Sequence, residues 1–152
     1  MWLIKLFTSF TGRIGRRAYW FGLIALILAS PLSVRAILSP DPFQEAFGAI
    51  QSLGMTGLFW TLGLLIPLAA LNTKRLHDLN QTGLIGVLFY APAAMSAVTL
   101  FTGWKIDALD QALSWTTLIA GLFGAASLWF LVKLGFYGGT SGANKYGADP
   151  SA

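Results

Sequence analysis

Four long apolar segments, separated by shorter polar ones, fill most of this chain. A transmembrane helix needs about 20 mostly apolar residues to cross roughly 30 Å of hydrocarbon. Four segments meet this requirement, at about 18–38, 50–71, 84–101 and 112–134. The third is the shortest, and local thinning of the bilayer accommodates a span of that length. The pattern predicts an all-α polytopic membrane protein, with four transmembrane helices in one domain over residues 1–152.

The two ends of the chain have sequence patterns that differ from those of the apolar segments. Segment 1–10 mixes large apolar residues with Lys5, and predicts either a short helix in the membrane interface or a lead-in to the first span. A basic start before an apolar run also occurs in cleaved signal peptides, but this run is long and further spans follow, so we expect an uncleaved anchor. Segment 135–152 begins with a Gly-rich turn and is expected to dock onto the end of the bundle, with Asn144 and Asp149 making turn or cap hydrogen bonds.

Basic residues lie mainly in the segments before the first span, between the second and third, and after the fourth. These segments hold eight of the ten bases: Lys5, Arg13, Arg16, Arg17, Lys74, Arg75, Lys133 and Lys145. The other two loops hold Arg35 and Lys105, against four acids. Positive charge accumulates on the cytoplasmic side of membrane proteins. We therefore predict a multi-pass membrane protein with both termini in the cytoplasm.

Composition supports a membrane protein and excludes several chemistries. Hydrophobic residues make up 55% of the chain and charged residues 11%, whereas soluble domains carry about 25% charge. The chain has no cysteine, which excludes disulfides, thiolate metal sites and cysteine nucleophiles. The net charge is +4, but the bases flank apolar spans, so we expect anionic lipid headgroups as partners and no nucleic acid.

Three polar clusters stand out, at 12–20, 74–78 and 142–150, and the charge pattern places all three on the cytoplasmic side. Their order around four apolar spans resembles the YhaH-type family of small bacterial inner-membrane proteins, a domain of unknown function. The resemblance covers essentially the whole chain and rests on Gly12, Arg13, Arg16, Tyr19, Trp20, Arg75, Leu76, His77, Asp78, Asn144, Tyr146, Gly147, Asp149 and Pro150. The sequence departs from the family pattern at Lys74, where arginine is usual, and at Leu84, where tryptophan is common. The resemblance implies the four-span fold and a location in the bacterial inner (plasma) membrane, and it implies no activity.

The clusters predict contacts to an anionic lipid or a partner protein through Arg13, Arg16, Arg17, Arg75, His77, Asp78, Asn144 and Asp149. One interpretation is a basic surface, with Lys74 included, that orients the protein and attracts anionic lipid. The more specific interpretation is an anion pocket in which Arg13, Arg16 and Arg75 hold phosphate or carboxylate by forked hydrogen bonds. Asp78 and Asp149 would then position these arginines.

The pair His77–Asp78 also suggests an enzyme. A metal site needs several further ligands, yet the chain has one histidine and six acids, four of them on the opposite side. Adjacent side chains point apart, which also disfavours a Ser–His–Asp relay. We therefore expect no catalytic residue, no metal and no cofactor, and a pH-sensing or loop-fastening role for the histidine.

Three functions remain open at this point. The leading hypothesis is a non-catalytic membrane subunit or adaptor whose basic face binds anionic lipid or a membrane-protein partner. The alternative is a small channel or carrier for an anionic solute, and the weaker alternative is a lipid-headgroup enzyme that uses His77 and Asp78. Small residues such as Gly121 and Ala125 fit either packing within the bundle or a homo-oligomer interface.

Overall fold

The structure is a computed structural model that describes residues 2–29, 39–102 and 115–150. Within these ranges the chain is helical and contains no β-strand, which confirms the all-α prediction for the described residues. The elements are α1 (Trp2–Thr8), α2 (Arg16–Ala29), α4 (Pro42–Asp78), the 3-10 turn η1 (Gly83–Gly86), α5 (Val87–Thr102) and α6 (Trp115–Phe136).

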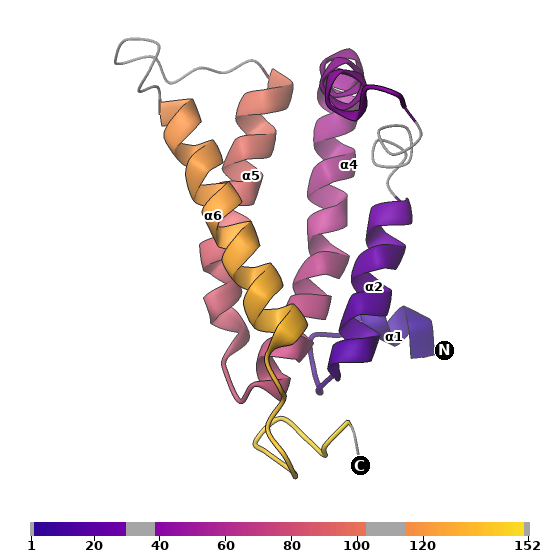
Figure 1. Ribbon diagram of the computed structural model, residues 1–152, viewed down its shortest axis with the longest axis vertical. Helices are drawn as coiled ribbons and strands as arrows, with labels where there is room; N and C mark the ends of the chain where they lie inside the picture. Colours follow the sequence, from indigo (N-terminus) through magenta and orange to yellow (C-terminus); the bar gives the residue numbers. More distant parts are fainter. Residues whose placement is uncertain (1, 30–38, 103–114, 151–152) are drawn as a thin grey trace.

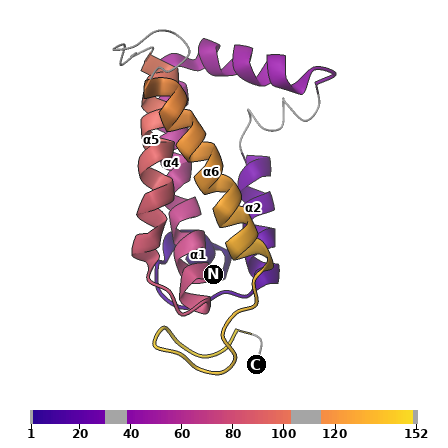
Figure 2. The same cartoon turned by 60° about the vertical axis from the view of Figure 1, so that its left-hand side comes forward.

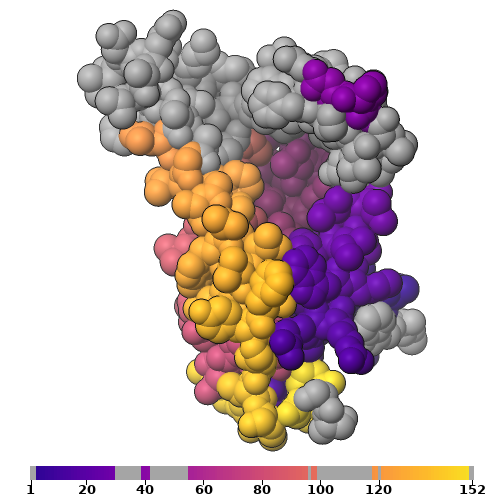
Figure 3. Space-filling view, in the orientation of Figure 1, coloured from indigo at the N-terminus to yellow at the C-terminus, as the bar shows by residue number. Residues whose placement is uncertain are grey.

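The long helices stand side by side, and both termini lie at the same end of the bundle (Figure 1). Helix α4 packs along α5 and α5 along α6, while α2 packs on α4. Helices α2 and α6 meet on one face in the lower half of the molecule (Figure 3) and diverge above it (Figure 1). The short α1 packs against α4. We call the end that carries α1 and residues 137–150 the tail end of the bundle.

Helix α4 is longer than the predicted second span, 50–71, at both ends. Its first part lies across the bundle, and the rest runs beside the other helices (Figure 2). Its last turns include residues 74–78, so this polar cluster is helical and not part of a loop. Residues three apart share a helix face, which places Arg75 beside Asp78 and turns His77 elsewhere.

Asn80 ends α4. Its φ is 57°, a left-handed conformation that asparagine tolerates better than most residues. The amide of Gln81 donates to the Leu76 carbonyl at 2.8 Å and that of Asn80 to the His77 carbonyl at 3.0 Å. This pattern is a Schellman motif, which satisfies carbonyls at the helix end. The polar cluster therefore sits on a well-defined terminus.

The described helices cover parts of the other predicted spans. Helix α2 covers the start of span 18–38, and η1 with α5 covers span 84–101. Helix α6 begins at Trp115, inside span 112–134; residues 30–38 and 103–114 lie outside the described residues. One helical stretch, Met55–Asp78, is long and apolar enough to cross a bilayer, while the apolar stretches Gly83–Met95 and Gly121–Phe136 are shorter.

The hydrophobic core includes side chains from α1, α2, α4, α5 and α6. Its buried members are Leu6, Ile14, Tyr19, Leu71, Leu76, Phe89, Ala93, Phe130 and Leu134. Close approach of α2 to α4 depends on Gly22, because a Cβ there would lie 2.6 Å from Leu71 Cδ1. Ile14, Tyr19 and Leu76 are core residues that lie within two of the polar clusters, so packing of the core also positions these clusters.

Candidate functional site

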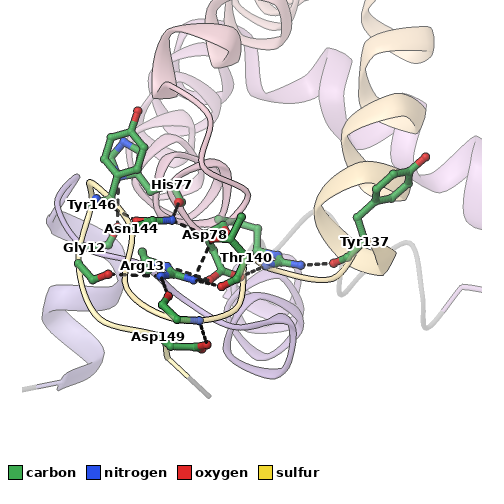
Figure 4. Close-up of polar contacts among 12 residues, drawn as sticks. Gly12, Arg13, His77, Asp78, Tyr137, Thr140, Asn144, Tyr146 and Asp149 are labelled. Carbon is green, nitrogen blue, oxygen red and sulfur yellow. Dashed lines mark hydrogen bonds and ion pairs between the residues drawn. The ribbon is translucent and has the colours of Figure 1, made fainter. Parts of the chain in front are cut away.

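The three polar clusters meet around the carboxylate of Asp78 (Figure 4). Oδ1 accepts hydrogen bonds from Arg13 Nε at 3.1 Å and Arg13 Nη2 at 2.9 Å, and Oδ2 accepts one from Arg75 Nη1. The three side chains are almost completely buried, with exposed fractions of 1% for Arg13, 0% for Arg75 and 3% for Asp78. One carboxylate thus joins two guanidinium groups from segments far apart in sequence.

Arg13 uses all five of its N–H donors inside the protein. Besides Asp78, Nη1 donates to the carbonyls of Gly142 at 2.7 Å and Gly147 at 3.3 Å. Nη2 donates to the carbonyl of Thr140 at 2.6 Å. A guanidinium has five donors in a fixed fork, so Arg13 has none left for an external anion. It fastens the segment before α2 to the C-terminal residues.

Side chains from α2 and α4 cap the C-terminal end of α6. The last four carbonyls of a helix lack partners within the helix and carry partial negative charge. Arg75 Nε donates to the Leu134 carbonyl at 2.7 Å and Trp20 Nε1 to the Gly135 carbonyl at 3.1 Å. Arg16 Nη1 makes a longer contact, 3.4 Å, with the Phe136 carbonyl. Arg75 also donates to the carbonyl of Tyr137, so its role in the fold is structural.

Residues 137–150, which we call the tail cap, fold over the end of α4. The amide and hydroxyl of Thr140 both donate to the Asp78 carbonyl, at 2.8 and 3.0 Å. Asn144 Nδ2 donates to the His77 carbonyl at 2.9 Å, and Asp149 Oδ2 accepts the Gly142 amide at 2.8 Å. Gly142 has a φ of 76°, which favours glycine over other residues. The predicted docking of this segment, and hydrogen bonds by Asn144 and Asp149, are present in the structure.

Lys74 fastens α1 to α4. Its ammonium group donates to the carbonyls of Lys5, at 2.6 Å, and Leu6, and the residue is buried. Both carbonyls belong to the short helix α1, whose last turn carries partial negative charge. A flexible ammonium group satisfies two such carbonyls without a planar fork. Lysine therefore suits this position, where the resembled family usually has arginine.

His77 points away from Asp78 and onto the tail cap. Its ring stacks on Tyr146, with centroids 3.8 Å apart and planes at 5°, and Nδ1 lies 3.1 Å from the Gly12 carbonyl. Since a carbonyl only accepts, Nδ1 carries the proton. Burial lowers the pKa of His77; the Gly12 carbonyl opposes this shift and Lys145 adds to it. His77 lies beyond the predicted span 50–71 and fastens the loop before α2.

We expect this arrangement to make the tail cap sensitive to acid. In the unfolded chain His77 takes up a proton near its ordinary pKa of about 6.5, whereas the folded pKa is lower. The unfolded state then binds more protons, so stability is complete above about pH 6.5 and falls as pH drops toward the folded pKa. His77→Asn keeps a donor near Gly12 and removes the titration. Thermal unfolding in detergent across this pH window should show a steeper loss of stability for the wild type than for His77→Asn; equal slopes would contradict the prediction.

Arg16 and Arg17 lie outside the buried network. Both are exposed at the start of α2, and Arg17 makes no hydrogen bond or ion pair with the described residues. The predicted site residues therefore divide into two groups. One group makes its contacts within the protein: Arg13, Arg75, His77, Asp78, Asn144 and Asp149. Arg16 and Arg17 form the other group, because both are exposed and Arg16 makes only the long contact to the Phe136 carbonyl. A single pocket formed by Arg13, Arg16 and Arg75 does not match this geometry.

Sequence reasoning missed several residues of the network. Thr140 binds both Arg13 and the end of α4, and the backbone of Gly139 lies directly against Asp78. The Gly-rich run 138–142 signals a turn, but a turn signal does not identify what the turn contacts. Backbone carbonyls accept most of the arginine hydrogen bonds here, and every residue has one, so no side-chain pattern marks them.

Comparisons with known proteins place the chain in a family. Residues 7–148 match the family described as "Protein of unknown function (DUF805)". The chain is 28% identical over 151 residues to "Inner membrane protein YhaI" of Escherichia coli (strain K12), covering 97% of this chain and 91% of that protein. It is 33% identical over 147 residues to "Uncharacterized protein YiiR" of the same strain, covering 93% and 85%. No solved structure matches. The predicted family resemblance is confirmed at this broader level, whereas the YhaH-type assignment stays a prediction; the chain belongs to the DUF805 family.

Proposed function

We propose that this chain is a four-span inner-membrane protein, with both termini cytoplasmic, that acts as a non-catalytic subunit or adaptor. Its basic face, formed by Arg16 and Arg17, binds an anionic membrane lipid or an acidic partner protein. The tail cap and the buried network around Asp78 serve as the rigid base of this face.

The exterior of the bundle supports the membrane assignment. Large apolar side chains are exposed on every long helix, among them Phe21, Phe59, Leu88, Leu122 and Leu128. Such a surface is costly in water and favourable in hydrocarbon. The relative YhaI is named as an inner membrane protein, and the termini of this chain lie at one end, as an even number of spans requires. The charge bias of the sequence supports a cytoplasmic position for that end.

The observation that carries the proposed function is that some bases at the tail end are bound inside the protein while others are exposed. Arg13, Lys74 and Arg75 are occupied by partners inside the protein. Arg16 and Arg17, on the first turn of α2, are exposed. A fixed base with exposed arginines at headgroup level favours binding of an anionic partner over chemistry.

The engagement of His77 and Asp78 supports a non-catalytic role. Asp78 Oδ1 and Oδ2 both accept from arginines, and His77 Nδ1 donates to the Gly12 carbonyl. A general base needs a lone pair directed at the substrate, but the Asp78 carboxylate is buried between two cations.

The test compares the wild type with the Arg16→Ala, Arg17→Ala double variant after extraction into native nanodiscs. We expect the wild type to retain an anionic lipid or a stoichiometric protein, and the double variant to lose it while keeping its unfolding temperature. Lys5→Ala, Lys133→Ala is the matched control, because it also removes two positive charges. Arg75→Ala is unsuitable, since removal of a buried group tests folding. Failure of the wild type to retain either class of partner would refute the proposal.

A further inference from the structure

An open groove of about 1050 Å³ lies where the start of α2 meets the end of α6. It is lined by residues of both helices and of the tail cap, including Gly15, Arg16, Arg17, Trp20, Gly135 and Pro150. Residues from three parts of the chain thus form the walls, and the buried network beside it fixes their positions.

We propose that this groove is a binding site for the phosphate group of one anionic phospholipid. The inference deepens the proposed function, on which it rests, because it names the ligand and confines its binding to one place. Phosphatidylglycerol, with a single phosphodiester and a glycerol headgroup, represents the class.

The charge in the groove matches a phosphate. Arg17 has no partner among the described residues, and Arg16 makes one long contact, so most of their N–H donors are available. Forked guanidinium groups bind phosphate oxygens by pairs of short hydrogen bonds. The groove lies at the first turn of α2, where the helix has amides without intrahelical partners and partial positive charge.

The nearby carboxylates do not oppose this assignment. Asp78 and Asp149 line a smaller adjoining pocket of about 220 Å³, which shares Gly15, Arg16 and Pro150 with the groove. Asp78 is held between Arg13 and Arg75, whose two positive charges exceed its single negative charge. Asp149 accepts the amide of Gly142. The acids therefore lie beside the groove and are themselves engaged.

An apolar wall favours a lipid over a soluble anion or an acidic peptide. The Trp20 indole is held in place by its hydrogen bond to the Gly135 carbonyl and by edge contact with Phe136, with centroids 5.6 Å apart. Phe136 is 63% exposed and continues this aromatic surface outside the groove. Tryptophan and tyrosine are enriched where membrane lipids change from headgroup to acyl chain. A phospholipid would use both the charged and the apolar wall, which a soluble phosphate cannot do.

The experiment titrates purified full-length protein in a neutral detergent with phosphatidylglycerol and counts bound lipids by native mass spectrometry. Phosphatidylcholine tests the need for net negative charge, and glycerol 3-phosphate tests the need for acyl chains. The variants are Arg16→Lys with Arg17→Lys, which keeps both charges, and Gly15→Glu. A side chain fits at Gly15, since a Cβ would have only Pro150 Cγ near it, at 4.0 Å, and the carboxylate would repel phosphate. Lys5→Ala, Lys133→Ala is the control for charge alone.

We expect one tightly bound phosphatidylglycerol per wild-type chain, and weaker binding of the other two compounds. Gly15→Glu and the double lysine variant should weaken binding by at least about tenfold, the order expected when charge-assisted hydrogen bonds are lost, while the Lys5/Lys133 control stays within about threefold. Equal losses in the control and the groove variants would overturn the groove and would also contradict the assignment of the basic face to Arg16 and Arg17. Equal binding of phosphatidylcholine would overturn the groove, and the proposed function would then rest on an acidic partner protein alone. Equally tight binding of glycerol 3-phosphate would overturn the assignment to a lipid. A wild type that binds no anionic lipid but retains an acidic protein would also overturn the groove and keep the adaptor role.

Discussion

Asp78→Asn is expected to destabilise the tail end of the bundle by about 3–5 kcal/mol, the cost of leaving buried charges without their partner. Arg13 and Arg75 have exposed side-chain fractions of 1% and 0%, and Asp78 is the carboxylate that both contact. An asparagine keeps the shape of the side chain but removes the negative charge. Two buried guanidinium groups would then have only neutral acceptors, which are backbone carbonyls and the Thr140 hydroxyl, to stabilise them.

The expected consequence is release of the tail cap and of the loop before α2, since both are fastened through Arg13. Thermal unfolding in detergent, together with limited proteolysis of residues 137–150, would measure it. Asp149→Asn is the matched control, because it removes the same charge from a less buried carboxylate at the same end of the bundle. An Asp78→Asn protein as stable and as protease-resistant as this control would show that the ion pairs are not essential.

Gly139→Ala is expected to cost about 1–3 kcal/mol, the range for overpacking a close-packed site. A Cβ on Gly139 would lie 2.6 Å from Asp78 Cγ and still nearer to Oδ2. The carboxylate cannot move away without lengthening its contacts to Arg13 and Arg75. Gly139 is not among the residues with positive φ, so the clash alone disfavours alanine.

The adjacent Gly138 provides a close control for this substitution. A Cβ there would meet no atom within 4 Å, so Gly138→Ala should change the unfolding temperature little. Equal effects of the two alanines would mean that the tail cap tolerates displacement and does not hold Asp78 in place. The direct contact would be confirmed if Gly139→Ala is strongly destabilising in the wild type but only weakly so in a protein that lacks Arg13 and carries Asp78→Ala.

The sequence predicted parts of the site but not the way in which they combine. Arg13, Arg75 and Asp78 were identified as a group because charge is scarce in this chain, so each polar cluster stands out. The spacing of Arg75 and Asp78 fits a pair on one helix face once α4 is known to extend to Asp78. The sequence could not predict which arginine faces inward, because Arg13, Arg16 and Arg17 lie within five residues of one another and share the same chemistry. The turn at Gly12 and the start of α2 at Arg16 separate them.

The boundaries of the helices were likewise predicted only in part from the sequence. Hydropathy identified apolar segments but placed the end of the second near residue 71, because it scores residues 74–78 as polar. The helix continues because α1, α6 and the tail cap satisfy the polar side chains of its last turns. It ends where Asn80 adopts the left-handed conformation that closes the Schellman motif.

The sequence by itself determined the helical class, the apolar segments and the gathering of charge into three clusters, because these depend on local composition and period. The tertiary structure alone decided that the clusters meet at Asp78, that Arg13 and Arg75 are buried, and that Arg16 and Arg17 remain outside. These outcomes depend on contacts between segments up to 134 residues apart, such as Arg13 with Gly147. They also depend on backbone carbonyls, which every residue carries and which only a fold can direct at a particular side chain.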